Sequence, residues 1–308
     1  MGGDVRGDVR VDLVLPFGLV DPQGRRARAA ALAPLTGHGE LHGADDANPF
    51  AAVLHLLAAS LVELGPFRAP DITPALLGQL LPVDRDHLLL HLHSISFGDV
   101  RYHTVECPQP ACGRRLDIRF ALSSADPPAV PDRTTGTLAL ADGRRVSYRL
   151  PTAADQVALH GLPPEALEAG FLQRCIRAGA ADGRAAGDRI SAGHDRDEPT
   201  GQRGDHIGCA EVLALPAAVR ADIVARIVAA SPAIDLAVPL DCVACGRAFR
   251  FVFDPVHALL AELTASRRDL IRQVHRLALS YHWSQAEILG LPRALRHEYL
   301  ALLEETAP

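Results

Sequence analysis

Two cysteine-rich turns stand far apart in the sequence and read Cys107-Pro-Gln-Pro-Ala-Cys112-Gly113 and Cys242-Val-Ala-Cys245-Gly246. We call them knuckle 1 and knuckle 2. In each, a glycine follows the second cysteine, and its freedom to adopt a positive φ lets the chain reverse there. A structural zinc ion takes four ligands in a tetrahedron, and two C-x₂₋₄-C turns supply four thiolates. The sequence therefore predicts one structural Zn²⁺ per chain, with the ligands Cys107, Cys112, Cys242 and Cys245.

The same cysteines leave two alternatives open. The knuckles could have kept their shape and lost their metal, or they could form disulfides, although nothing else in the sequence indicates an oxidising compartment. A four-thiolate site has no open position for water or a substrate, so it predicts a structural metal rather than metal catalysis. Binding of the ion would then contribute to the free energy of folding.

The bulk properties are those of a globular protein. The 308 residues are enough for a large core and for two domains. The net charge of −6 gives no general attraction to nucleic acids or anionic membranes. The first residues lack an apolar signal segment, and the longest apolar run, over 50–64, is too short and interrupted to cross a bilayer. We therefore expect a cytoplasmic protein without membrane insertion.

The order of sequence features repeats along the chain. A predicted hairpin that contains Gly24-Arg25-Arg26 is matched by a later one that contains Gly143-Arg144-Arg145. A Leu-Pro pair, a predicted helix and a predicted strand then lead into each knuckle, and the intervals Pro82–Cys107 and Pro216–Cys242 differ by one residue. This agreement predicts a tandem duplication, in which a pseudo-two-fold arrangement brings the knuckles face to face.

The predicted fold class is α+β, with two hairpin–helix–knuckle halves joined through the Cys₄ site and a C-terminal helical unit. The segment from 179 to 206 is rich in Gly, Asp and Arg, which predicts a mobile loop. The expected organisation is a first repeat over 1–123 with its knuckle at 107–112, a linker over 124–136, a second repeat over 137–254 with its knuckle at 242–245, and a helical unit over 255–308.

Local patterns predict further elements. Apolar periodicity predicts one helix over 50–64, and the Gly- and His-rich residues 37–48 predict an irregular connector. In the C-terminal unit we expect separate helices over 256–263 and after Ser266, and a short helix opened by the capping box Ser284-Gln-Ala-Glu287. In the last helix, the residues expected to face inward are Leu295, Tyr299 and Leu302.

The sequence patterns around the other candidate histidines and cysteines indicate packing rather than catalysis or metal binding. His87 and His91 have the i, i+4 spacing of a metal-binding pair, but the glutamate of an HExxH motif is absent, so we interpret them and His93 as packing or surface residues. Cys175 and Cys209 have no neighbouring base in the sequence that would activate a nucleophile. Motifs for a nucleophilic serine or for nucleotide binding are also missing. We therefore expect neither an enzyme nor a small-molecule substrate.

Zinc ribbons often bind nucleic acid, so a nucleic-acid-binding or regulatory protein is the alternative function. The basic residues around the knuckles are few, and the chain as a whole is acidic. The basic residues beside the knuckles that favour nucleic-acid binding are Arg114, Arg115, Arg247 and Arg250.

The sequence resembles the T4-type phage baseplate proteins and their relatives encoded beside contractile injection systems. The resemblance covers the knuckles and residues 240–303 best. Its most specific part runs from His275 to Leu291 and includes Trp283-Ser284 and Glu287-Ile288-Leu289. The N-terminal half matches only in outline, and residues 179–206 look like an insertion.

This resemblance implies a non-enzymatic component or assembly factor of the baseplate hub, which works with hub and spike proteins in the producing bacterial cell. It covers both a transient assembly factor and a resident part of the baseplate. On this reading, the C-terminal helices are the expected partner surface.

Overall fold

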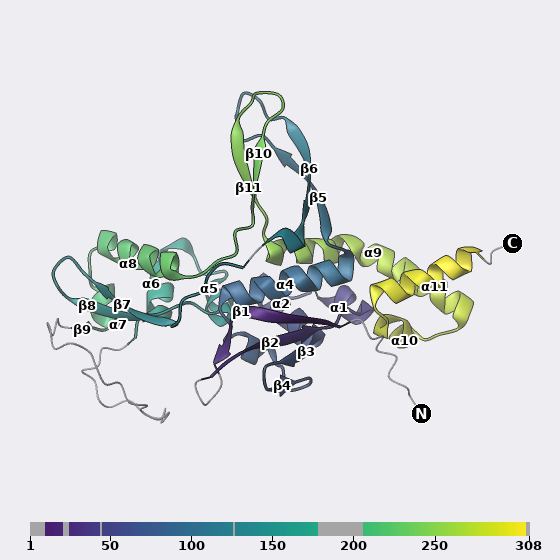
Figure 1. The fold of residues 1–308 in the computed structure, drawn as a ribbon, viewed down its shortest axis with the longest axis horizontal. Helices are drawn as coiled ribbons and strands as arrows, with labels where there is room; N and C mark the ends of the chain where they lie inside the picture. The colour runs from purple at the N-terminus through teal and green to yellow at the C-terminus, as the bar shows by residue number, and fades with distance from the viewer. Residues whose placement is uncertain (1–9, 21–24, 44, 126, 178–205, 306–308) are drawn as a thin grey trace.

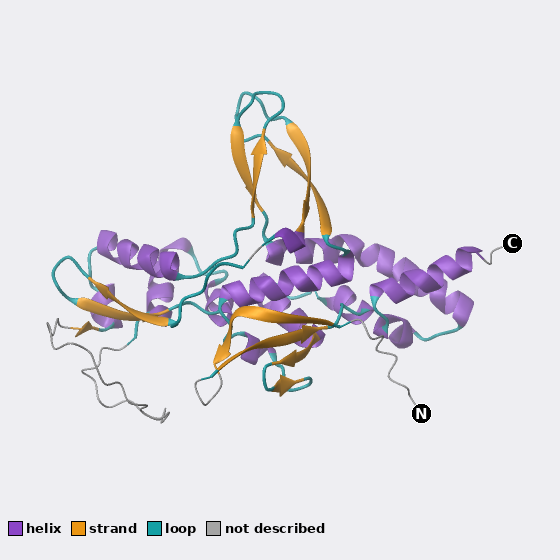
Figure 2. Ribbon diagram, in the orientation of Figure 1, coloured by secondary structure: helices purple, strands orange, loops and turns teal. Residues whose placement is uncertain are grey.

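The computed structural model describes residues 10–20, 25–43, 45–125, 127–177 and 206–305. These residues form a mixed α+β structure with four small sheets and the helices α1 to α11. An elongated body contains most of the helices, and two β-hairpins project from it together (Figure 1, Figure 2). We call these two hairpins the arm. The predicted α+β class is confirmed, whereas most of the predicted loop 179–206 lies outside the described residues.

An antiparallel sheet and its covering helices form the centre of the body. The strands, in spatial order, are β1 (Val11–Val20), β2 (Arg26–Leu32), β3 (Leu61–Leu64) and β4 (Phe67–Arg68). The helices that contribute to the core beside them are α2 (Pro49–Ser60), α3 (Pro74–Leu77), α4 (Pro82–Phe97) and the start of α9 (Pro255–Tyr281).

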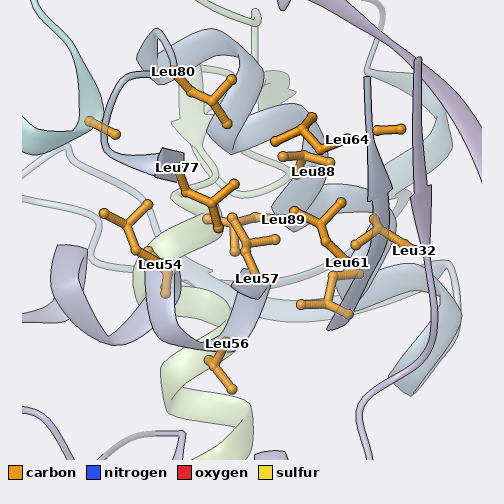
Figure 3. Close-up of a cluster of buried hydrophobic side chains, with 14 of the residues drawn as sticks. Leu32, Leu54, Leu56, Leu57, Leu61, Leu64, Leu77, Leu80, Leu88 and Leu89 are labelled. Carbon is orange, nitrogen blue, oxygen red and sulfur yellow. The ribbon is translucent and has the colours of Figure 1, made fainter. Parts of the chain in front are cut away.

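Leucines supply most of the largest buried cluster, which lies between this sheet and these helices (Figure 3). Leu57, Leu88 and Leu89 are fully buried in it. Each fully buried leucine stabilises the fold by about 1.5–3 kcal/mol. The cluster therefore gives α4, and the hairpin that follows it, a rigid foundation.

The arm consists of two antiparallel hairpins from distant parts of the sequence. Its strands are β5 (Val100–Glu106), β6 (Arg115–Ala121), β10 (Ala237–Asp241) and β11 (Ala248–Val252). Where the arm meets the body, four rings pack together with centroid separations from 5.2 to 6.2 Å. We call this group the base cluster; it consists of His103, Phe120, Phe251 and Phe253.

A separate lobe lies at one end of the body and has its own buried cluster, centred on Val146, Leu172 and Ile223. Its strands are β7 (Thr135–Ala139), β8 (Arg145–Arg149) and β9 (His206–Ile207), and β9 pairs in parallel with β8. Its helices are α6 (Pro164–Cys175), α7 (Cys209–Leu213) and α8 (Ala217–Ala230), while α5 (Ala153–Leu159) connects it with the central body.

The opposite end of the body is helical (Figure 2). There α9, α10 (Gln285–Gly290) and α11 (Arg293–Glu305) pack around buried Leu277, Ile288 and Leu300. A buried ion pair between Glu40 of α1 (Gly37–His42) and Arg296 of α11 joins this end to the central body. The predicted capping box is present, because the hydroxyl of Ser284 and the carboxylate of Glu287 cap each other's backbone N–H groups.

Three local predictions were wrong for identifiable reasons. Residues 37–42 form helix α1 rather than an irregular connector, because tertiary contacts such as the Glu40 ion pair hold them. The predicted helix over 50–64 ends at Ser60, since the next four residues pair with β2 as a strand. The predicted break at Ser266 is absent: α9 continues through it, and the Ser266 hydroxyl donates to the Leu263 carbonyl within the helix.

The last helix differs from its prediction in the side chain that faces inward. Leu302 was expected to face inward, but 50% of it is exposed. Arg296 takes the interior position instead and is fully buried. An arginine at a core position cannot be recognised from apolar periodicity.

Candidate metal centre

Each knuckle forms the tight turn of one arm hairpin. In knuckle 1, the N–H of Cys107 donates to the carbonyl of Arg114 at 2.9 Å and closes the end of the β5–β6 ladder. Gly113 follows the second cysteine with φ of +54°, a conformation that favours glycine. In knuckle 2, Gly246 has φ of +70° and donates its N–H to the carbonyl of Cys242 at 2.8 Å. The glycines therefore act as the sequence predicted.

The four knuckle cysteines come together at the tip of the arm. The sulfur of Cys107 lies 3.7 Å from that of Cys245, and the sulfur of Cys112 lies 3.8 Å from that of Cys242. All four sulfurs lie within 4.8 Å of one another. They are free thiols, because the sulfurs of a disulfide are only about 2.05 Å apart. Each close pair joins one knuckle to the other, so the group links the two hairpins.

The spacing suits a tetrahedral metal ion bound to sulfur. A Zn–S bond of about 2.3 Å places neighbouring sulfurs of a tetrahedron about 3.8 Å apart. Both of the cross-knuckle separations, 3.7 and 3.8 Å, match that length. Four cysteines in this arrangement can hold a metal ion, and they are the one such group of three or more potential ligands within the described residues.

The charges within the group also favour a cation. The backbone N–H groups of Ala244 and Cys245 donate to the Cys242 sulfur and lower its pKa to about 6. At Cys107 the N–H of Gln109 also acts to lower the pKa, but burial and the neighbouring thiols raise it to about 11. Four thiolates this close repel one another. A bound divalent cation would offset that repulsion and hold the ligands deprotonated.

Several contacts that the sequence did not reveal position the group. Arg247, directly after knuckle 2, donates to the side-chain oxygen of Gln109 in knuckle 1 at 2.8 Å. At the other end of β5, Arg101 donates to the carbonyls of Phe97 and Gly98 and fastens the hairpin to the end of α4. The sequence marked Arg247 only as a basic residue beside knuckle 2 and did not mark Arg101, so the folded arrangement alone shows these contacts.

The other residues considered in the sequence lie away from the four thiols. His93 is buried beside Arg101 and Phe97, and its pKa is lowered to about 4 by burial and then by Arg101. Cys175 is buried in the core of the end lobe, where burial raises its pKa to about 11. Burial likewise raises the pKa of Cys209. The two cysteines outside the knuckles thus lack the lowered pKa of a reactive thiol.

The basic residues beside the knuckles have acidic or polar neighbours. Arg250 forms an exposed ion pair with Asp235 at 3.0 Å. On the outer face of β6, Arg115 lies opposite Glu106, and Asp117 accepts a hydrogen bond from Thr104. The described surface of the arm is therefore of mixed charge.

Searches of protein-family models, curated proteins and solved structures found no match to this chain. None of the described helices combines the length and apolar character that a bilayer crossing requires.

Proposed function

We propose that Cys107, Cys112, Cys242 and Cys245 bind one structural Zn²⁺ per chain. The observation that carries this proposal is the convergence of four free thiols from two hairpins at separations typical of a tetrahedral Zn–S₄ centre. The ion would supply the bond that closes the tip of the arm. It would have no open coordination position, so its role would be structural.

We also infer that the two halves arose by duplication. Support comes from the order of their elements: the hairpin β1–β2, helices and the knuckle hairpin β5–β6 are followed by the hairpin β7–β8, helices and the knuckle hairpin β10–β11. The helix before each knuckle hairpin begins at or just after the proline of a Leu-Pro pair, Pro82 or Pro216. A duplication accounts for two similar hairpins that share one metal site.

Beyond the metal, we propose that the protein is a non-enzymatic structural or assembly component of a contractile, phage-tail-like baseplate, active in the cytoplasm of the producing bacterial cell. The support is the sequence resemblance, strongest over His275–Leu291. That segment spans the end of α9 and all of α10 in the described structure. Its expected partners are hub and spike proteins.

The exposed side of α9 offers a specific test of this proposal. Ile271 and Leu279 are 54% and 65% exposed, although both are large apolar residues. If they belong to a contact surface of the kind that exposed apolar patches mark, a charged replacement at each should disrupt it. Val228 on α8 is 53% exposed and serves as a matched control at the other end of the body.

The experiment is co-purification of the full chain with the hub and spike proteins encoded beside it. We expect the wild-type chain and Val228→Glu to retain these proteins, and the pair Ile271→Glu and Leu279→Glu to lose them. Capture of neither hub nor spike protein by the wild-type chain would refute the baseplate proposal. Equal capture of the hub and spike proteins by both variants would show that the exposed side of α9 is not the partner surface.

The same preparations test the nucleic-acid alternative. A ribbon-type binder would be retained on a DNA or RNA column and released as the salt concentration rises. The mixed charge of the arm gives no reason to expect such retention at physiological salt.

A further inference from the structure

A second group of potential metal ligands lines a pocket near the foot of the arm. His87 and His91 lie one turn apart on α4, and their ring centroids are 4.6 Å apart. Both rings line a pocket of about 220 Å³. Asp99, and Ser123 of the short helix that follows β6, also line this pocket.

The ring nitrogens of the two imidazoles have no hydrogen-bonding or ion-pair partner among the described residues. Within the described part of the chain, each ring contacts only the other as an aromatic neighbour. Burial, and then His91, lowers the pKa of His87 to about 4. Burial also lowers the pKa of His91. Both rings are therefore neutral near pH 7, and a neutral imidazole is the form that binds metal.

Asp99 gives the pocket a negative charge. Hydrogen bonds from the hydroxyl and N–H of Ser123, at 2.6 and 2.9 Å, hold its carboxylate in place. The Ser123 hydroxyl is the main cause of the lowered pKa of Asp99, so this group is ionised. A cation in the pocket would gain from this charge without requiring Asp99 as a direct ligand.

We propose that the His87–His91 pair binds one divalent transition-metal cation of the kind that prefers imidazole, such as Ni²⁺, Cu²⁺ or Zn²⁺. The site is distinct from the four thiols and would be completed by water, because no third protein ligand lies close to the two rings among the described residues. A bound cation would lie between α4 and the Leu122–Ser124 turn and would help to hold the foot of the arm.

The test uses the full chain loaded with zinc and then titrated with Ni²⁺ in a non-coordinating buffer by isothermal titration calorimetry. We expect one additional Ni²⁺ per chain. His87→Gln and His91→Gln should each weaken Ni²⁺ binding by at least about tenfold. Removing a residue that merely hydrogen-bonds to a metal ligand already costs about that much affinity, and each of these changes removes a ligand itself. His55→Gln is the control, because His55 is exposed on α2 and should leave the affinity unchanged.

A second measurement does not depend on the folding of the variants. In the wild-type chain, paramagnetic Ni²⁺ should first broaden the ring signals of His87 and His91 in NMR spectra, and leave His103 of the base cluster sharp. Absence of saturable binding, equal affinity in the double variant, or broadening of other histidines first would overturn the proposal.

Discussion

In the central body, the largest core brings together side chains from β1, β2, β3, α2, α4 and α9, whereas at the tip of the arm four cysteine sulfurs connect two short hairpins. The core of the body consists largely of fully buried leucine side chains. The arm has its aromatic base cluster near the body, but Val243 at its tip is 85% exposed. An isolated two-stranded hairpin is at best marginally stable in water. The two regions must therefore depend on different interactions.

This difference indicates where the proposed metal ion would matter in the molecule. Removing it should leave the body intact, because the largest core contains no residue of the arm strands. The tip should open. Apart from the cysteines, the described side-chain contact between the two hairpin ends is the Arg247–Gln109 hydrogen bond, and this bond is exposed to solvent.

Removal of the metal should affect the arm selectively. Binding to four-ligand zinc sites in small peptides stabilises them by about 10–16 kcal/mol, so loss of even a third of that energy would speed local opening roughly a thousandfold. Amide hydrogen exchange after chelation should rise in 100–121 and 237–252 and stay unchanged in α2 and α4. Uniform exchange throughout the chain would show that body and arm unfold as one unit.

The buried ion pair that joins α11 to the body should respond strongly to mutation. Arg296 is fully buried and donates to Glu40 and to the Leu291 carbonyl. Arg296→Met leaves the buried Glu40 carboxylate with Arg293 as its remaining partner, so we expect a loss of about 3 kcal/mol in urea denaturation, the low end of the cost of breaking a buried ion pair. The double variant with Glu40→Gln should recover part of that loss. A loss below 1 kcal/mol in the single variant would contradict this account.

Two buried carboxylates should give opposite pH dependence. Asp84 accepts from the N–H groups of Phe17 and Gly18, and burial raises its pKa from 3.8 to about 6. Its contribution to stability is present below pH 4 and is lost as the pH rises through about 6. Burial also acts to raise the pKa of Asp155, but Arg149 and Thr152 lower it below 3.8. The contribution of Asp155 is therefore present above pH 4 and is lost as the pH falls.

Urea denaturation of single variants can separate these two carboxylates. Relative to wild type, Asp84→Asn should gain about 1–3 kcal/mol of unfolding free energy between pH 4 and pH 7. Asp155→Asn should be less stable than wild type by a nearly constant amount between pH 4 and pH 7, and this deficit should shrink as the pH falls below 4. A difference between Asp84→Asn and wild type that stays constant from pH 4 to pH 7, or a deficit of Asp155→Asn that grows below pH 4, would contradict these surroundings of the two carboxylates.

The smallest effect should come from the exposed ion pair on the arm. Arg250 and Asp235 are 3.0 Å apart, and both side chains are more than half exposed. Exposed pairs contribute about 0–1 kcal/mol. Arg250→Ala should therefore leave both the zinc content and the thermal midpoint nearly unchanged. A large loss of either would mean that this pair, rather than the metal, holds the second hairpin.

The arm was predictable from sequence to an extent that the body was not. Cysteine spacing, the glycines after the second cysteines and the alternating strands are local signals, and the structure places all four cysteines together as they indicated. Helix α1 and the buried Arg296 are held by the ion pair between Glu40 and Arg296, which lie more than 250 residues apart in the sequence. Neither feature can therefore be predicted from a local pattern. Ser266 looked like a helix cap, but burial of Leu263 and Leu270 on either side of it sustains a continuous helix.

The central claim is that the two knuckles share one zinc ion, and metal content tests it most directly. Native mass spectrometry should count one zinc in the wild-type chain and in Cys209→Ser, whose cysteine lies outside the knuckles. Cys107→Ser and Cys245→Ser should each lose the ion, because each removes a ligand from a different hairpin. Zinc-free wild-type protein, or a zinc ion retained in either knuckle variant at full affinity, would contradict the account.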